Sequence, residues 1–448
     1  MSGNFRSFDR DTMFLMPPSV QDWLPKEHLA RFVVEVVEQL DLRTLREGYA
    51  GRGSAAYHPE MLIALLFYGY ATGIRASRKL EAATYESVPF RFIAANTHPD
   101  HDTISDFRLR FLPQLKNIFE QLLVIAQESG CLKIGQVSLD GTKVRANASK
   151  HNALSLKRAN ELQQRFRREA ERMLELAEEA DRDDQDDDFH LPPELARRED
   201  RIRAIKEAQE RIRAREAERI EREKAEREET RAERRAFEEA NGRRFESHPN
   251  RNSIKRNPNA QINLTDEDSR IMRTGDGFVQ AYNGQLAVDC DSMLVVAEHL
   301  TQRATDIGEI KPALKALTAL PIGTPSALLA DAGYCSELNI ERIAACGIEP
   351  YVSIGREQHH WGLRHFKRPT LPKTDAGPMA HMRYRLRTTA GRAIYARRKS
   401  TVEPVIGNLK RSMGFRQFLM RGFEKASGEW TLACLAWNLR RIHALKPT

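Results

Sequence analysis

The sequence predicts an α/β core, in which a mixed sheet is flanked by helices, together with an N-terminal all-α domain and a long charged helical insertion. Three observations predict this class. Residues 1–130 show helical spacing, residues 151–260 are dominated by charge, and short strand patterns alternate with helical ones on both sides of that charged stretch. The core is therefore assigned to residues 131–150 and 261–448.

The N-terminal domain contains two strong helical patterns. Pro59 opens the first, PEMLIALLFYGYATG, and Gly73 is its expected stop. Thr103 and Asp106 form a capping pattern at the start of the second, which carries a kink at Pro113. These patterns predict a bundle of helices.

Two arginines of the second helix are candidate DNA contacts. Arg108 and Arg110 stand beside the apolar positions of the helix, so residues 103–110 fit the recognition helix of a helix-turn-helix arrangement. A helical bundle whose arginines are merely solvated explains the same pattern. Both interpretations stay open.

The insertion is defined by its charge. Between Glu194 and Ala240, 30 of 47 residues are charged, 15 of each sign, which suits a long helix with acid–base pairs three and four residues apart. Residues 156–180 form a second charged helical stretch. A two-helix arm is predicted, with a partly disordered charged linker as the alternative, and neither interpretation places chemistry here.

The core elements follow in a simple order. Strand patterns lie in GQVSLDGTKV, in GFVQAYNGQLAVD and MLVVAEHLT, which form a hairpin, and in SALLADAGY and EPYVSI, giving a sheet of about five strands. Helices are expected over residues 305–320, in NIERIAACG and over residues 398–412. Without the insertion, these elements make a mixed sheet with helices packed on it.

The net charge of +8 is concentrated at one end of the chain. Residues 356–448 carry 20 basic and 5 acidic residues, which indicates a polyanion bound by this segment. The long basic loop over residues 356–392 fits phosphate tracking. Neutralising bases between Arg356 and Arg421 is therefore expected to flatten the salt dependence of DNA binding, whereas changes between Arg197 and Arg235 are expected to alter it little.

Other protein classes are excluded by composition. No apolar run approaches the roughly 20 residues that a membrane-spanning helix needs, and the N-terminus lacks the apolar region of a signal peptide. The five cysteines include no C-x-x-C pair, so a zinc knuckle or disulfide framework is not expected. A reducing cytoplasm is the predicted location.

Three carboxylates have the positions of metal ligands. Asp140 lies on the first strand, Asp331 ends a buried strand, and Glu403 lies within the basic C-terminal helix. Ligands collect at strand ends of open α/β sheets, and carboxylate oxygens suit Mg²⁺, two ions of which act together in phosphoryl transfer. Taken singly, each has a structural alternative: a turn, a loop cap and an ordinary salt bridge, respectively.

These motifs resemble the DDE transposases of bacterial insertion sequences, in particular the group with a long charged insertion after the first aspartate. The matching segments are SLDGTKVRANASKH around Asp140, DGFVQAYNGQLAVD, LADAGYCSE around Asp331, STVEPVIGNLKRSMGF around Glu403, and HDTISDFRLRF in the N-terminal domain. Their order along the chain is more specific than any single motif.

The resemblance implies an RNase H-like core with Asp140, Asp331 and Glu403 as a triad that binds two Mg²⁺ ions, for which Mn²⁺ may substitute. It implies strand cleavage and strand transfer at the element's terminal inverted repeats. The implied partners are double-stranded DNA, both element ends and target, and further copies of the chain in a synaptic complex. The implied location is the bacterial cytoplasm, in association with the nucleoid.

A family signature around the glutamate is only partly kept. Lys410 stands at the expected seven positions after Glu403, as a catalytic residue that reaches a phosphate. Four residues rather than three separate Arg398 from Glu403, so either the helix entry holds an extra residue or Lys399 takes the arginine's place. Arg398, Lys399, Lys410 and the neighbouring Arg411 are the DNA contacts predicted here.

Two other functions remain compatible with the sequence. One is a domesticated or catalytically inactive DNA-binding protein derived from a transposase, against which the intact triad argues. The other is a nuclease that cuts DNA without joining it.

Overall fold

The computed structural model describes residues 19–47, 56–181, 193–245, 253–257, 259–275, 277–355, 370–373 and 376–446. The chain divides into two units. The first comprises Met1–Leu132, Ser412–Gly414 and Thr431–Thr448, and the second Lys133–Arg411 and Phe415–Trp430. Of the basic loop predicted over residues 356–392, residues 356–369 and 374–375 lie outside the described residues. The loop prediction was wrong for the later part, because residues 378–387 and 389–392 belong to helices.

The first unit is built from helices. They are α1 (Val20–Trp23), α2 (Leu29–Gln39), α3 (Arg43–Glu47), α4 (Pro59–Thr72), α5 (Ser77–Glu86), α6 (Val88–Ile93), α7 (His101–Phe111) and α8 (Leu115–Glu128), with Thr431–Leu445 of α15 (Phe423–Leu445). The bounds predicted for α4 are confirmed, because Pro59 occupies its first turn and Gly73 ends it with a φ of 85°.

The second predicted helix of this unit differs in two details. Its N-cap is Asp100, whose side chain accepts a hydrogen bond from the Thr103 backbone at 2.8 Å, so the cap predicted at Thr103 was wrong. The kink at Pro113 is confirmed as a 3₁₀ turn, Leu112–Gln114, between α7 and α8.

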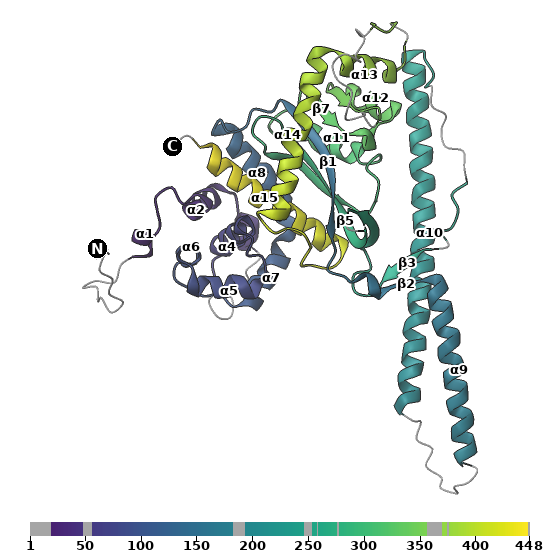
Figure 1. Cartoon of the computed structure of the whole chain (residues 1–448). Coiled ribbons are helices and arrows are strands. Elements are labelled where there is room, and N and C mark those ends of the chain that lie inside the picture. Colours follow the sequence, from purple (N-terminus) through teal and green to yellow (C-terminus); the bar gives the residue numbers. More distant parts are fainter. Residues whose placement is uncertain are drawn as a thin grey trace, which may run out of the picture. The chain divides into compact units, whose positions relative to one another are not determined.

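A six-stranded mixed sheet forms the centre of the second unit (Figure 1). Its strands are β1 (Gln136–Arg145), β4 (Arg270–Thr274), β5 (Gly277–Asp289), β6 (Val295–Thr301), β7 (Ala327–Ala330) and β8 (Glu349–Val352). β1 pairs with β5 in antiparallel and with β7 in parallel orientation, and β8 continues the parallel side. β4 and β6 follow one another along the other edge of β5.

β4 is the strand that the sequence did not predict. Its sequence RIMRT has two adjacent apolar residues between arginines, which hides the alternation of a half-buried strand. It is held by pairing with the first five residues of β5. Besides the two insertion helices, this unit contains the helices α11 (Ile310–Thr318), α12 (Glu337–Ala345), α13 (Pro378–Arg387), α14 (Thr389–Arg411) and the start of α15.

Both predicted helices of the insertion are present, as α9 (Leu156–Asp181) and α10 (Pro193–Asn241). They pack together over a small apolar cluster beside a second sheet, β2 (Ala153–Ser155) and β3 (Gln261–Asn263). The later part of α10 runs along the core, which Figure 1 shows, and three ion pairs join the two: Glu226–Arg303, Glu229–Lys311 and Glu233–Arg342. Arg243, two residues after α10, is paired with Glu341. The later part of α10, which was predicted to belong to a projecting arm, is therefore attached to the sheet domain.

Two further contacts concern α15. Trp430 of this helix is buried, with 1% of its surface exposed. Asp268 accepts a hydrogen bond from the backbone of Phe423 at 3.0 Å, at the first residue of α15. None of the helices in the described ranges is long and apolar enough to cross a membrane.

Candidate active site

The two predicted aspartates lie on neighbouring strands. Leu139 of β1 pairs in parallel with Ala330 of β7, so Asp140 and Asp331 are the next residues of the two strands. β7 is buried along its whole length, and the chain leaves the sheet at Asp331, which caps a 3₁₀ turn by accepting a hydrogen bond from Gly333. Parallel pairing therefore places the two aspartates side by side, Asp140 midway along β1 and Asp331 directly after the carboxyl end of β7.

Asp140 is in an environment that disfavours its charge. Burial raises the pKa of Asp140 to about 6, and the neighbouring Asp331 adds to the rise, whereas the Arg398 guanidinium opposes it. One carboxylate oxygen accepts a hydrogen bond from the backbone of Gly141 at 2.8 Å. A cation near the other oxygen is the simplest way to hold this carboxylate ionised.

Arg398 supplies such a cation and links the first and third predicted ligands. Its Nη1 lies 3.1 Å from Asp140 Oδ2, and its Nη2 lies 3.2 Å from Glu403 Oε1. The Arg398 side chain is 10% exposed, whereas that of Glu403 is 51% exposed. One guanidinium thus bridges carboxylates that are 263 positions apart in the sequence.

The structure shows which of the two adjacent basic residues, Arg398 or Lys399, lies near the carboxylates. Adjacent residues of a helix point about 100° apart, so only one of the two can face the carboxylates. Arg398 faces them, and Lys399 is exposed.

Lys410 lies seven residues after Glu403 on the same helix, α14. Its Nζ donates a hydrogen bond to the backbone oxygen of Lys143 on β1 at 2.9 Å. Burial lowers the pKa of Lys410, and the nearby Lys143 ammonium lowers it further. The contact leaves further N–H donors of this ammonium for a ligand.

A fourth carboxylate, Asp306, lies beside this group and was not predicted. Its Oδ1 accepts hydrogen bonds from Asn283 at 2.7 Å and Gln285 at 2.8 Å, and Lys143 Nζ lies 3.4 Å away. Asn283 and Gln285 are fully buried on β5. Polar residues at these positions of an otherwise apolar strand were the available signal, because buried amides need partners.

Gly141 makes room for this network. A Cβ at this position would lie 2.4 Å from Gln285 Nε2 and 2.6 Å from Asp306 Oδ1. A side chain next to Asp140 is therefore incompatible with the hydrogen bonds that hold Asp306.

A basic pocket of about 600 Å³ lies next to Asp140 on β1, because Gly141 is one of its lining residues. Its five basic side chains come from β1, from α14 and from the segment after α14: Lys143, Arg145, Lys410, Arg411 and Arg416. No carboxylate is among its lining residues, so the pocket suits phosphate oxygens.

The predicted N-terminal DNA contacts differ from each other. Arg110 is exposed. Arg108 is 7% exposed and donates hydrogen bonds to the Arg75 carbonyl and the Ser77 hydroxyl, at 3.0 and 3.3 Å. Burial and these contacts argue against DNA binding by Arg108.

The next feature is whether Asp140, Asp331 and Glu403 could hold a metal ion. Among the described residues, no three His, Cys, Asp or Glu side chains are grouped closely enough to hold a metal ion. The chemistry of the donors nevertheless fits a divalent cation, because Asp140 and Asp331 lie side by side and a guanidinium already bridges Asp140 to Glu403. Arg398 stands where positive charge is needed.

Comparisons with known families match both ends of the chain. A model described as a transposase domain (DUF772) matches residues 18–110, and one described as a transposase DDE domain matches residues 367–443. The second match includes Arg398, Glu403 and Lys410, while Asp140 and Asp331 lie outside both. No curated protein and no solved structure matches. The two matches support the resemblance of this chain to the DDE transposases of insertion sequences.

Proposed function

We propose that this transposase catalyses metal-dependent DNA strand cleavage and strand transfer at the terminal inverted repeats of an insertion sequence. The observation that carries the proposal is the convergence of Asp140, Asp331 and Glu403, with Arg398 between two of them, beside a pocket lined by basic side chains. The strand order supports an RNase H-like core, since an antiparallel pair and a parallel pair flank β1.

DDE transposases generally use a divalent metal, and the residues that would hold it here are Asp140, Asp331 and Glu403. We propose two Mg²⁺ ions, with Mn²⁺ able to substitute. A bound divalent cation polarises a phosphoryl oxygen and lowers the pKa of water. Because Arg398 already contacts Asp140 and Glu403, it is proposed to hold these carboxylates apart from one another and to keep them ionised.

The chain's own basic residues would position the DNA. Lys410 is fixed by the Lys143 carbonyl and faces the basic pocket, so its remaining donors are placed for a phosphate next to the scissile bond. Arg411 lines the same pocket, and Lys399 is exposed on the same helix. Catalysis would then consist of positioning the phosphodiester and neutralising its developing charge.

The domain roles are also proposals. Residues 131–150 with 261–448 would form the catalytic domain, residues 151–260 the insertion, and residues 1–130 the domain that binds element ends, with exposed Arg110 as a contact. Synapsis of two DNA ends would bring together at least two copies of the chain.

The test is an assay that separates binding, cutting and joining. Full-length protein is incubated with Mg²⁺, labelled DNA that carries the element's ends, and a supercoiled target. Cut DNA that becomes joined to the target is the expected result. Binding without cutting would indicate an inactive DNA-binding protein, and cutting without joining would indicate a nuclease.

Substitutions connect that assay to the site. Asp331→Ala is expected to abolish cleavage and leave DNA binding largely intact, because this carboxylate lies at the strand end. Glu424→Gln is the matched control, since Glu424 is an exposed acid of the same unit outside the site. Wild-type cleavage by Asp331→Ala would show that the triad is assigned wrongly.

A further inference from the structure

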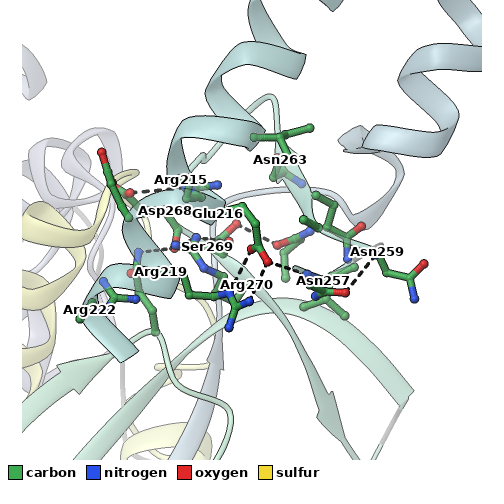
Figure 2. Close-up of a pocket in the computed structure, with 17 residues that line it drawn as sticks. Arg215, Glu216, Arg219, Arg222, Asn257, Asn259, Asn263, Asp268, Ser269 and Arg270 are labelled. Atoms are coloured by element: carbon green, nitrogen blue, oxygen red, sulfur yellow. Dashed lines mark hydrogen bonds and ion pairs between the residues drawn. The ribbon is translucent and has the colours of Figure 1, made fainter. Parts of the chain in front are cut away.

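Helix α10 and the sheet enclose a second charged cavity within the second unit, of about 320 Å³. Four arginines line it: Arg215, Arg219 and Arg222 from α10 and Arg270 from β4. Figure 2 shows the three α10 side chains beside Arg270. None of the three triad carboxylates is among its lining residues.

The α10 arginines share one face of the helix because they are spaced by four and by three residues. One of them is already neutralised. Arg219 donates hydrogen bonds to both oxygens of Glu216, at 3.0 and 2.7 Å, and is also paired with Glu223. Glu216 thus accepts hydrogen bonds from Arg219 and from the backbone N–H of Asn257. The charge that remains belongs to Arg215, Arg222 and Arg270.

Few acidic side chains are placed to neutralise these three guanidinium groups. Asp268 lies 3.7 Å from Arg215, and its other oxygen accepts the hydrogen bond from Phe423. Glu218, the other acid of the wall, is exposed. Arg222 is exposed and makes no ion pair or hydrogen bond with any residue that the structure describes.

Two of the guanidinium groups, those of Arg215 and Arg270, are partly buried. Nη1 of Arg215 is buried and has no hydrogen-bond partner among the described residues. Arg270 donates to the backbone oxygens of residues 267–269, which carry no net charge. Burial lowers the pKa of Arg270 to about 10, and repulsion from Arg215 adds to the effect. The cavity therefore holds positive charge and a buried donor that its own residues do not satisfy.

We propose that this pocket binds a phosphate group of DNA. Guanidinium groups match phosphate oxygens with paired hydrogen bonds, and three of them converge on a cavity at the small end of the range for ligand sites. The DNA source rests on the proposed function, whereas a phosphate site as such does not. The proposal opposes the expectation from sequence that bases between Arg197 and Arg235 contribute little to DNA binding.

The test uses the full chain and three variants. Arg222→Gln removes an exposed guanidinium and should leave the fold intact. Arg215→Gln removes the buried donor. Arg213→Gln is the matched control, because Arg213 is exposed on α10 and lies nine residues from Arg222, on the opposite face of the helix. Thermal melts of each variant establish that the protein is folded before binding is compared.

Two binding measurements distinguish the sources of phosphate. The first follows fluorescence anisotropy of a labelled duplex over a series of salt concentrations. Loss of one phosphate contact should lower the slope of log K against log salt by about 0.9 in Arg222→Gln and in Arg215→Gln, and leave Arg213→Gln unchanged. The second titrates inorganic phosphate into protein without DNA by calorimetry.

Each outcome decides the proposal. A reduced slope in both pocket variants but not in the control supports a DNA phosphate. Phosphate binding that the same variants lose, with unchanged DNA slopes, supports the anion site and rejects DNA as its source. If neither measurement distinguishes Arg222→Gln from Arg213→Gln, the pocket is not a phosphate site. Because neither measurement depends on cleavage, failure here leaves the proposed catalytic function untouched.

Discussion

The candidate active site and the α10 pocket are two charged sites of opposite sign within the same unit. In the first, acids outnumber bases, and Arg398 contacts two of the carboxylates at 3.1 and 3.2 Å. In the second, four arginines line the pocket with three acids. Of these acids, Glu216 is paired with Arg219, Glu218 is exposed, and Asp268 lies 3.7 Å from Arg215 while also binding the start of α15. Buried charge is costly unless it is paired.

The difference shows how each site can be assigned a ligand. Where the chain supplies one internal counter-ion for several carboxylates, as Arg398 does, the site is partly neutralised and its remaining charge is negative. Where the available acid also binds another group, as Asp268 binds the backbone of Phe423, the excess charge is positive. The first therefore calls for a cation and the second for an anion. Substitutions at both sites test this contrast.

The largest effect is expected from removing charge at the active site. Asp140→Asn should reduce strand cleavage by a factor on the order of 10³ or more, because a group that acts within a catalytic unit is lost, while DNA affinity is retained. Arg222→Gln should retain cleavage at low salt and lower the slope of log K against log salt by about 0.9. Gel assays of cleavage and anisotropy on both proteins measure the two effects. Parallel losses in both variants would mean that the sites do not have separate roles.

A large effect on stability is expected from removing the internal counter-ion. Arg398→Met should lower the free energy of unfolding by about 3–5 kcal/mol, because it leaves a buried carboxylate unpaired. Lys399→Met, its exposed neighbour, should change it by less than about 0.5 kcal/mol. Denaturant unfolding in the presence of a chelator compares the two variants. Equal stabilities would show that Arg398 does not neutralise the site.

A smaller loss is expected at the α10 pocket. Arg270→Gln should cost about 1–3 kcal/mol, because the backbone oxygens of residues 267–269 lose their charged donor. Relief of repulsion from Arg215 offsets part of the loss, which is why the effect should be smaller than at Arg398. Arg273→Gln, exposed on the same strand, is the control. A more stable Arg270→Gln protein would show that repulsion outweighs the hydrogen bonds.

The smallest effect has the opposite sign. Gly407 lies within α14, between Glu403 and Lys410, and a Cβ there would meet no atom within 4 Å. Gly407→Ala should raise the free energy of unfolding by about 0.5–1 kcal/mol, because alanine loses less backbone entropy in a helix. Thermal melts measure it. Destabilisation would indicate that this face of α14 is more crowded than the structure shows.

Features with a local cause could be predicted from the sequence. The start of α4 at Pro59 and its end at Gly73 follow from backbone preferences of single residues. The strands around Asp140 and before Asp331 could be predicted because apolar residues precede both aspartates. The helices of the insertion could be predicted because charge and helical spacing persist over tens of residues. By contrast, the N-cap at Asp100 was missed because several polar residues competed for that position.

Only the tertiary structure decided which charges meet. Asp140 and Arg398 are 258 residues apart, and Arg215 and Asp268 are 53 apart, so no periodicity in the sequence relates them. The choice between Arg398 and Lys399, the place of Asp306 beside the triad, and the arginine-lined pocket under α10 all depend on packing between distant elements. By itself the sequence determined most of the elements, though not β4, and the types of charge on them. Coulomb interactions depend on distances in space, and those distances exist only once the sheet, α10 and α14 are packed together.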